Sequence, residues 1–257
     1  MDLGLNDRVA VITGASYGLG EAMAQSLVEE GARVVICARG EEQLNRTAQA
    51  LGPNAVAIQA DVSRAEDITQ LFDRTVGQFG KLDILVNNAG SYHLSEGLGL
   101  SDEEWRDNLD LNLFSVIRCS RLAVPLMQKQ KWGRIVNISS IFGKQPNAGL
   151  IDYNTTKAAV ISLTKTLADE LAKENILVNA VCPGPTHTPL WDVLAKTLNP
   201  DDPHGMINDF AAANIPLGRF GRPEEIADLV AFLSSERASY ITGAAYDIDG
   251  GMVKSMG

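Results

Sequence analysis

Short apolar runs rich in β-branched residues alternate with longer amphipathic segments along this chain of 257 residues. The apolar runs predict strands at residues 8–13, 33–37, 55–59, 83–86, 134–138, 176–181 and 244–248. Helical spacing predicts helices at residues 19–30, 41–51, 65–79 and 152–173, and a long helical region interrupted near Asn112 and Pro125. Because near-continuous apolar strands are buried on both faces, the alternation predicts an α/β fold: a parallel sheet of about seven strands with helices on both faces.

The domain organisation follows from the absence of a proline-rich or charged linker, so residues 1–257 are expected to form a single domain. The least regular stretch, residues 183–222, contains six prolines and follows the sixth predicted strand. It therefore lies at the carboxyl edge of the sheet, where such folds bind ligands, and we expect it to form a loop and lid. The helical spacing of Trp191, Leu194 and Leu198 favours a lid helix, with an ordinary core stripe as the alternative.

A glycine-rich turn, TGASYGLG at residues 13–20, joins the first predicted strand to the first predicted helix. Gly14, Gly18 and Gly20 permit a tight turn and let a phosphate approach the backbone. The helix that follows presents unpaired N–H groups to an anion. The turn favours a doubly wound, Rossmann-like sheet that binds a dinucleotide. Its spacing differs from the usual G-x-G-x-x-G pattern, and a glycine turn set by packing alone is the alternative.

This turn resembles the T-G-x-x-x-G-x-G motif of the short-chain dehydrogenase/reductase family, and further motifs of that family follow in order. The resemblance covers essentially the whole chain, from Thr13 to Gly251, and matches the single-domain type. It implies an oxidoreductase that transfers a hydride between a nicotinamide and a carbonyl or secondary alcohol. The other motifs are Asp61-Val62, Asn87-Asn88-Ala89-Gly90, Asn112, Ser140, Tyr153 with Lys157, and Pro183-Gly184.

The candidate catalytic group centres on Tyr153 and Lys157, which are four residues apart and so share one face of a predicted helix. A free tyrosine has a pKa of about 10, and a neighbouring ammonium lowers it. We expect Tyr153 to act as the general acid in reduction and the general base in oxidation. The resemblance implies that Ser140 polarises the substrate oxygen, and that Asn112 holds a water linking Lys157 to solvent. A plain polar helix residue is the alternative for Asn112, and Ser139 is expected to point to the other face of its strand.

The type of dinucleotide is indicated by the end of the second strand, Cys37-Ala38-Arg39, where an acidic residue would select NAD. That acid is missing, and an arginine can grip the 2′-phosphate of NADP bidentately. The sequence therefore favours NADP(H), with NAD(H) possible and with Arg39 as a solvated loop residue as the alternative. Tyr17 stands where many NADP-using relatives carry a basic residue, so a second phosphate contact is missing there.

Two further segments complete the expected cofactor contacts. Asp61 can accept a hydrogen bond from the adenine amino group, or it can cap the next helix. Asn87 is expected to brace neighbouring strands. The resemblance places Thr186 and Thr188 against the nicotinamide. The expected cofactor-binding residues are Gly14, Ser16, Tyr17, Gly18, Leu19, Gly20, Arg39, Asp61, Val62, Asn88, Ala89, Gly90, Tyr153, Lys157, Pro183, Gly184, Thr186 and Thr188.

Other function classes are less well supported. None of the three histidines lies in a nucleophile-elbow motif, which disfavours acyl-transfer chemistry. A regulator that senses the nucleotide without catalysis is the second hypothesis, although it would not need Tyr153, Lys157 and Ser140 together. Tyr92, His93 and Phe142 are candidate walls of a substrate pocket. His187 is placed at the surface or in that pocket.

The net charge of −10 disfavours nucleic-acid binding, and no stretch is apolar enough for a membrane span. Cys37, Cys119 and Cys182 are widely spaced in apolar segments, which predicts buried reduced thiols rather than disulfides or a metal site. With no signal peptide apparent, a cytoplasmic protein is expected. The expected partner is a small-molecule carbonyl or alcohol substrate, and the resemblance implies a homo-oligomer, either a tetramer or a dimer.

Overall fold

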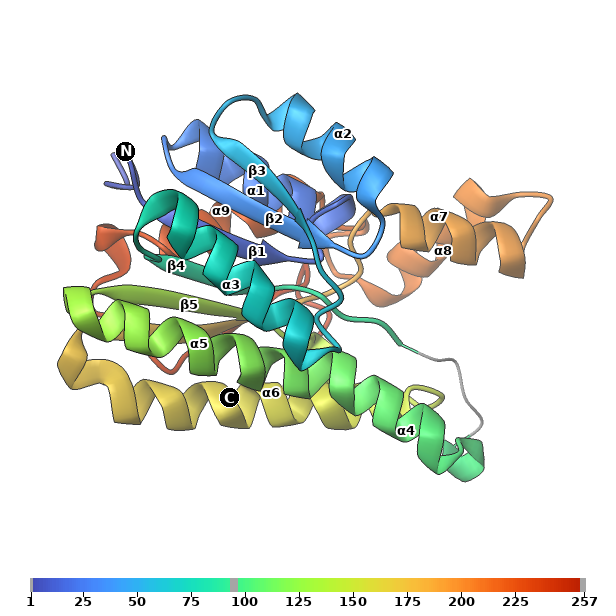
Figure 1. The fold of residues 1–257 in the computed structure, drawn as a ribbon. Helices are drawn as coiled ribbons and strands as arrows, with labels where there is room; N and C mark the ends of the chain where they lie inside the picture. Colours follow the sequence, from blue (N-terminus) through green and yellow to red (C-terminus); the bar gives the residue numbers. More distant parts are fainter. Residues whose placement is uncertain (1, 93–96, 255–257) are drawn as a thin grey trace.

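The computed structural model describes residues 2–92 and 97–254 of the chain. Its strands form one parallel sheet in the order β3-β2-β1-β4-β5-β6-β7 (Figure 1). The predicted parallel α/β sheet is confirmed, and each strand lies within two residues of its expected bounds. The strands are β1 (Val9–Thr13), β2 (Arg33–Ala38), β3 (Ala55–Gln59), β4 (Ile84–Asn87), β5 (Gly133–Ile138), β6 (Ile176–Pro183) and β7 (Ala245–Ile248).

Helices cover both faces of the sheet, each over its own apolar cluster (Figure 1). One face packs against α1 (Gly18–Glu29), α2 (Glu41–Leu51) and α9 (Pro223–Leu233). The other face packs against α3 (Ala65–Phe79), α5 (Ser115–Gln130) and α6 (Ile151–Leu171). With both faces covered, every residue of β1, β4, β5 and β6 is buried, whereas the edge strands β3 and β7 are mostly half-buried. This burial explains why the inner strands are largely apolar.

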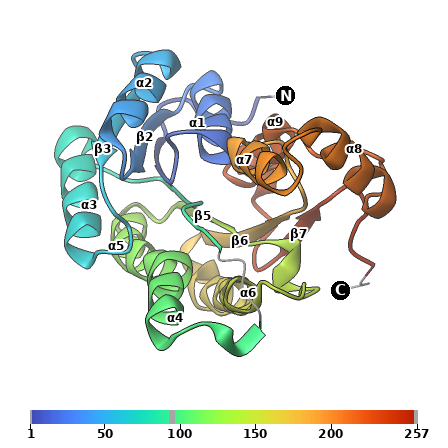
Figure 2. The ribbon, with the colours of Figure 1, turned by 90° about the vertical axis from the view of Figure 1, so that its right-hand side faces the viewer.

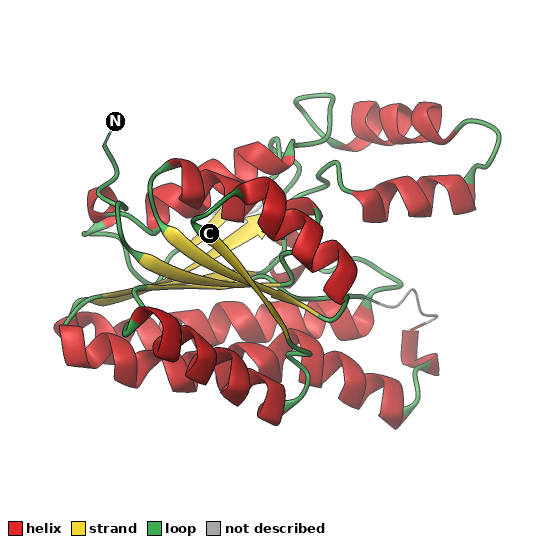
Figure 3. Cartoon of the chain, turned by 45° about the horizontal axis from the view of Figure 1, so that its top comes forward, coloured by secondary structure: helices red, strands yellow, loops and turns green. Residues whose placement is uncertain are grey.

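Two helical segments project past the carboxyl edge of the sheet. The helix α4 (Asp102–Leu109) leads through a π-helical turn, Asp110–Phe114, into α5. The helices α7 (Pro189–Leu198) and α8 (Pro203–Asn214) form a hairpin that stands off the sheet (Figures 1 and 3). The stretch expected to be irregular, residues 183–222, is therefore largely helical, and its prolines at 189 and 203 start the two helices.

The expected interruptions of the long helical region have different outcomes. Asn112 lies in the π-helical turn, so the irregularity expected there is confirmed. The break expected near Pro125 is wrong, because α5 continues through it. Pro125 is exposed, so the backbone carbonyl that loses its partner faces solvent, while Cys119, Ala123 and Met127 hold the opposite side of the helix in the core. The free energy gained by burying one face of α5 outweighs the free energy lost with the hydrogen bond on the other face.

The sheet has its topological switch point at β1, which pairs with β2 on one side and with β4 on the other. From β1 the chain adds β2 and β3 on one side of the sheet and then β4 to β7 on the other side, so the loops that leave β1 and β4 separate there. In open parallel sheets such a crevice at the carboxyl ends of the strands is the usual place for a ligand.

Three further features of the described residues concern the cysteines, membrane-spanning helices and metal-binding groups. Cys37, Cys119 and Cys182 are free and buried, as expected. Across residues 2–92 and 97–254, no helix has the length and apolar character that a bilayer span requires. In the same part of the chain, no three His, Cys, Asp or Glu side chains gather into a metal-binding group.

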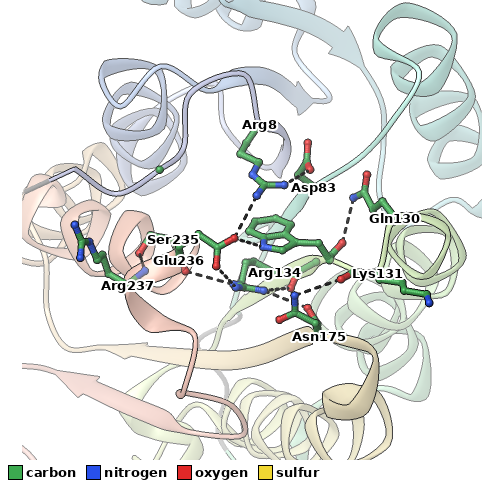
Figure 4. A network of polar contacts seen from close by, with 12 residues as sticks. Arg8, Asp83, Gln130, Lys131, Arg134, Asn175, Ser235, Glu236 and Arg237 are labelled. Carbon is green, nitrogen blue, oxygen red and sulfur yellow. Dashed lines mark hydrogen bonds and ion pairs between the residues drawn. The ribbon is translucent and has the colours of Figure 1, made fainter.

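A polar network ties the opposite, amino edge of the sheet together (Figure 4). The ring of Trp132 is sandwiched between two guanidinium groups, with Arg8 at 3.7 Å and Arg134 at 4.3 Å from its centroid. Its indole N–H donates to Glu236 at 2.6 Å, and Glu236 also pairs with Arg8 at 3.3 Å and Arg134 at 3.5 Å. Arg134 is fully buried on β5, and burial lowers its pKa to about 10 although Glu236 raises it. Glu236 therefore compensates a buried charge.

Replacing Glu236 with alanine is expected to lower the free energy of unfolding by about 2 kcal/mol, because the buried Arg134 loses its carboxylate partner. Denaturation in guanidinium chloride measures the change. The matched control is Glu42→Ala, which breaks the exposed pair with Arg46 and is expected to change stability little. Equal losses in the two variants would contradict a special role for the buried network.

Candidate active site

A cavity of about 660 Å³ opens at the carboxyl edge of the sheet, between the α7–α8 hairpin and the loops after β4 and β5. Figure 2 looks onto this edge. All of the residues expected to bind a cofactor line the cavity, together with Ser140. The structure therefore brings into one place residues from Gly14 to Thr188 that are far apart in the sequence. Asn112 is the exception, since it lies behind the cavity wall.

The glycine turn runs close to the loop after β4. Gly14 has φ +65°, and a Cβ atom there would lie 2.8 Å from the Cα of Ala89. A Cβ at Gly20 would lie 2.7 Å from the Cα of Ala15. Tyr17 precedes α1 without a side-chain hydrogen bond to the helix, so the first N–H groups of α1 lack a side-chain cap. The turn thus leaves open backbone donors beside a close glycine cradle, which fits a pyrophosphate group.

Hydrogen bonds between the ends of β1 and β4 fix this cradle; we call them the β1–β4 link. The Thr13 hydroxyl accepts from the backbone N–H groups of Asn88 and Ala89, each at 3.0 Å. The Asn88 amide donates to the carbonyl oxygens of Thr13 and Gly14, each at 2.9 Å. The side chain of Asn88 is therefore used within the protein and shapes the cavity. On the neighbouring strands, the Asn87 amide donates to Asn137 at 2.8 Å, so its expected role as a brace is confirmed.

The adenosine end of the cavity lies at the ends of β2 and β3. Arg39 is exposed there, and none of the ion pairs formed by the described residues involves it. Its carbonyl accepts from Gln59 at 2.8 Å, which holds the backbone while the guanidinium stays available. The Asp61 carboxylate accepts from the backbone N–H and the hydroxyl of Ser63 at 3.0 and 2.7 Å. Asp61 therefore closes the turn ahead of α3, whose cap is Arg64, and it also lines the cavity.

The candidate catalytic residues converge on α6 and the end of β5. Lys157 is buried, its ammonium lies 5.4 Å from the ring centroid of Tyr153, and it donates to the carbonyl of Ile138 at 2.9 Å. The Ser140 hydroxyl lies at the end of β5 and accepts from the N–H of Phe142 at 3.1 Å. Ser139 donates to the carbonyl of Lys157 at 2.8 Å, so its side chain is engaged with α6 rather than with a reacting group.

The pKa values of this group differ from the shift expected for tyrosine beside a lysine. Burial raises the pKa of Tyr153 to about 12, although its hydrogen bond with Ser140 lowers it. Burial also lowers the pKa of Lys157 to about 8. In the protein alone the pKa of Tyr153 is therefore raised rather than lowered, and the hydroxyl is protonated at neutral pH. A protonated tyrosine is the form that donates a proton.

Asn112 holds the loop after β4 in place. Its side-chain amide donates to the carbonyl of Ser91 at 2.7 Å and to Asn108 at 2.8 Å. Its side-chain oxygen accepts from the N–H of Ser91 at 3.0 Å. A Cβ atom at Gly90 would lie 2.7 Å from that oxygen and 3.3 Å from the Lys157 ammonium, so Asn112 and Lys157 both border Gly90.

The loop after β6 borders the other side of the cavity. Thr186 is buried and donates to the carbonyl of Gly184 at 3.0 Å, and Thr186 and Gly221 form an isolated β-bridge. Thr188 precedes α7, and its methyl group would lie 3.6 Å from a Cβ atom at Gly18. The loop and the glycine turn are therefore neighbours, which places Thr188 beside the first turn of α1.

The part of the cavity beyond Tyr153 is the end at which a substrate is expected, and we call it the substrate end. Tyr92 packs edge-on against Tyr153 with ring centroids 5.8 Å apart, and Phe142 also lines the cavity, as expected. His93 lies outside the described residues. Trp191 and Leu194 line the cavity, whereas Leu198 is 60 % exposed, so the helical stripe faces the site only at its start. His187 is not among the described residues that line the cavity. Its ring packs against Phe220 instead, with ring centroids 5.2 Å apart.

Several lining residues were not anticipated from the sequence. Phe210 reaches the cavity from α8, and Asn147, Ala148 and Leu150 reach it from the loop ahead of α6. No motif marks these positions. The one available signal was the position of residues 144–150 between the expected Ser140 and Tyr153, which makes that loop a neighbour of the reacting group.

The α7–α8 hairpin has an apolar cluster of its own. Trp191, Phe210 and Phe220 form an aromatic wall, with Trp191 4.9 Å from Phe220 and 5.9 Å from Phe210 between ring centroids. Beneath the wall are buried side chains that do not belong to either cluster of the sheet. These are Ala195, Ile207, Ala211 and Ile215.

Comparison with known proteins places the chain in a family. A family model described as enoyl-(acyl carrier protein) reductase matches residues 14–253. The 3-oxoacyl-[acyl-carrier-protein] reductase FabG of Staphylococcus aureus is 40 % identical over 247 residues, covering 95 % of this chain and 97 % of its own length. FabG of Aquifex aeolicus is 39 % identical over 256 residues, covering 98 % and 100 %.

Among solved structures, L-sorbose reductase from Gluconobacter frateurii, complexed with NADPH and L-sorbose, is similar to this chain with a TM-score of 0.97. It is 39 % identical, and the match covers 100 % of both chains. The family model and these relatives span nearly the whole sequence. The chain belongs to the short-chain dehydrogenase/reductase family of oxidoreductases.

Proposed function

We propose that the protein is an NADP(H)-dependent reductase of a carbonyl group, with Tyr153 as the general acid. The observation that carries the proposal is the convergence of Ser140, Tyr153 and Lys157 on the same cavity as the glycine turn. The relatives named above are reductases of a 3-oxoacyl thioester and of a ketose, and both substrates carry a ketone. We propose further that residues 183–222 act as the cofactor loop and lid.

The residues around the cavity fit NADPH, which supplies the hydride when it is bound. The turn from Gly14 to Gly20 and the first N–H groups of α1 would hold the pyrophosphate, and Thr188 lies beside them. The exposed Arg39 would bind the 2′-phosphate, because its guanidinium has no ion pair among the described residues. The solved L-sorbose reductase binds NADPH, which supports this choice over NADH.

The chain's own residues supply the proton. The Tyr153 hydroxyl donates it to the substrate oxygen, and the Ser140 hydroxyl donates a hydrogen bond to the same oxygen. Lys157 places positive charge beneath the Tyr153 ring as the phenolate forms, which lowers the cost of losing the proton. Asn112 is a positioning residue that holds Ser91, which directly precedes Tyr92 in the lining of the cavity. We propose that the tyrosine is reprotonated by way of Lys157, whose ammonium, like Asn112, borders Gly90.

Substitution of Tyr153 by phenylalanine is expected to lower kcat for ketone reduction by at least about 100-fold, because the proton donor is lost. The affinity for NADPH, measured by fluorescence titration, is expected to stay within about threefold of the parent, because the glycine turn is untouched. The matched control is Tyr240→Phe, at a fully exposed tyrosine outside the cavity. Full activity in Tyr153→Phe would refute the proton-donor role, and cofactor binding without turnover in the parent would favour the sensing alternative.

Replacing Arg39 with aspartate is expected to shift the ratio of kcat/KM for NADPH to that for NADH by at least about 10-fold toward NADH. The physical reason is that a guanidinium that binds the 2′-phosphate is exchanged for a carboxylate that repels it and accepts from the ribose hydroxyls. The control is Arg46→Asp, the same charge change at an exposed position of α2 outside the cavity. An unchanged ratio in Arg39→Asp would remove Arg39 from cofactor selection.

A further inference from the structure

The substrate end of the cavity carries no charged side chain in the described part of the chain. The charged residues that line the cavity lie elsewhere: Arg39 and Asp61 are at the ends of β2 and β3, and Lys157 is buried beneath Tyr153. Lys157 already donates to the carbonyl of Ile138 at 2.9 Å. The residues that line the substrate end are Ser91, Tyr92, Phe142, Asn147, Ala148, Leu150, Trp191, Leu194 and Phe210.

This lining has consequences for the charge of a ligand. A carboxylate or phosphate that enters beyond Tyr153 would leave water without finding a guanidinium or a free ammonium, and an unpaired buried anion is costly. Trp191 and Phe210, with ring centroids 5.9 Å apart, instead offer an apolar surface. Asn147 supplies a side-chain amide in a loop that Asn154 holds by donating to the Asn147 carbonyl at 2.7 Å. The end of the cavity therefore suits an uncharged compound with an apolar face and a few polar groups.

Two acidic segments flank the carboxyl edge of the sheet, onto which the cavity opens, and we call them the acidic mouth. The helix α4 (Asp102–Leu109) carries four acidic residues and one basic residue. Residues 189–214, which include α7 and α8, carry four acidic residues and one basic residue. These two segments lie on opposite sides of the carboxyl edge (Figure 2), and together they account for −6 of the net charge of −10. An anionic carrier would meet like charge at both contacts, which slows association and disfavours docking.

We propose that the substrate is an uncharged ketone free in solution, rather than an acyl group presented by an anionic carrier. This inference rests on the proposed function. The uncharged lining selects the part of the substrate that enters. The acidic mouth selects against a carrier that would remain outside. The two observations concern different residues and point to the same class of substrate.

The test compares matched pairs that share a carbonyl and differ in charge. Two pairs are ethyl acetoacetate with acetoacetate and cyclohexanone with 4-oxocyclohexanecarboxylate. Two more pairs compare the uncharged acetoacetyl thioester of N-acetylcysteamine with acetoacetyl-coenzyme A and with acetoacetyl-acyl carrier protein. Oxidation of NADPH and of NADH is followed at low and at physiological salt. In each pair we expect kcat/KM to be at least tenfold higher for the uncharged member, with the difference between the thioesters shrinking as salt screens the mouth.

A charge-reversed variant tests the role of the mouth separately. Asp192 and Asp209 are exposed and do not line the cavity, but each adjoins a lining residue in the sequence. The double variant Asp192→Lys with Asp209→Lys is expected to raise the ratio of kcat/KM for acetoacetyl-coenzyme A to kcat/KM for ethyl acetoacetate at least threefold at low salt, because only the anionic substrate responds to the charge. The control is Glu29→Lys with Asp73→Lys, the same charge change at exposed positions of α1 and α3 that do not line the cavity.

The outcomes distinguish the inference from the function on which it rests. Reduction of the anionic or carrier-bound member as fast as its uncharged partner overturns the inference and leaves a ketone reductase. An equal response of both double variants removes the mouth from the explanation and overturns the carrier part of the inference. No oxidation of either cofactor with any member of the panel overturns the proposed function itself.

Discussion

The β1–β4 link is the contact on which the candidate site depends. Thr13, Gly14, Asn88 and Ala89 join two strands that are neighbours in the sheet but about 75 residues apart in the chain. The link brings the glycine turn so close to the next loop that a side chain at Gly14 would collide with Ala89. That close approach leaves the backbone of the turn open and places Gly90 over Lys157 and Asn112. The glycine turn and the loop that borders Lys157 are therefore held together by one set of hydrogen bonds.

Much of this arrangement could be predicted because the parallel sheet has strong local signals. The buried strands are largely apolar, and the turns that carry the site follow them at regular intervals, so the expected cofactor-binding residues between Gly14 and Thr188 all line the cavity. Pro125 misled the prediction, because its usual effect on a helix was overridden by burial on the opposite face of α5. The pKa of Tyr153 also differed from expectation, since desolvation depends on neighbours that the spacing of two residues does not reveal.

The parts that could not be predicted lie where tertiary packing alone decides. Phe210 and Asn147 reach the cavity from segments without any motif, and their role follows only from where the α7–α8 hairpin and the loop before α6 rest. Arg134 is similar, because it is fully buried against Trp132 and Glu236, and no motif marks that contact in the sequence. The net charge of the protein also does not predict the charge inside the cavity. The acidic surface coexists with a cavity whose cofactor end presents Arg39 and open backbone donors.

The separate apolar cluster of the α7–α8 hairpin has a consequence for how such a protein changes over time. Ile207, Ala211 and Phe220 pack with one another rather than with the clusters of the sheet, so substitutions there leave the scaffold's own packing undisturbed. Substitutions among these residues are therefore expected to reshape the cavity wall that Trp191 and Phe210 form without repacking the sheet. Selectivity is free to drift in a lineage while the hydride-transfer machinery, built on the sheet, stays under the constraint of folding.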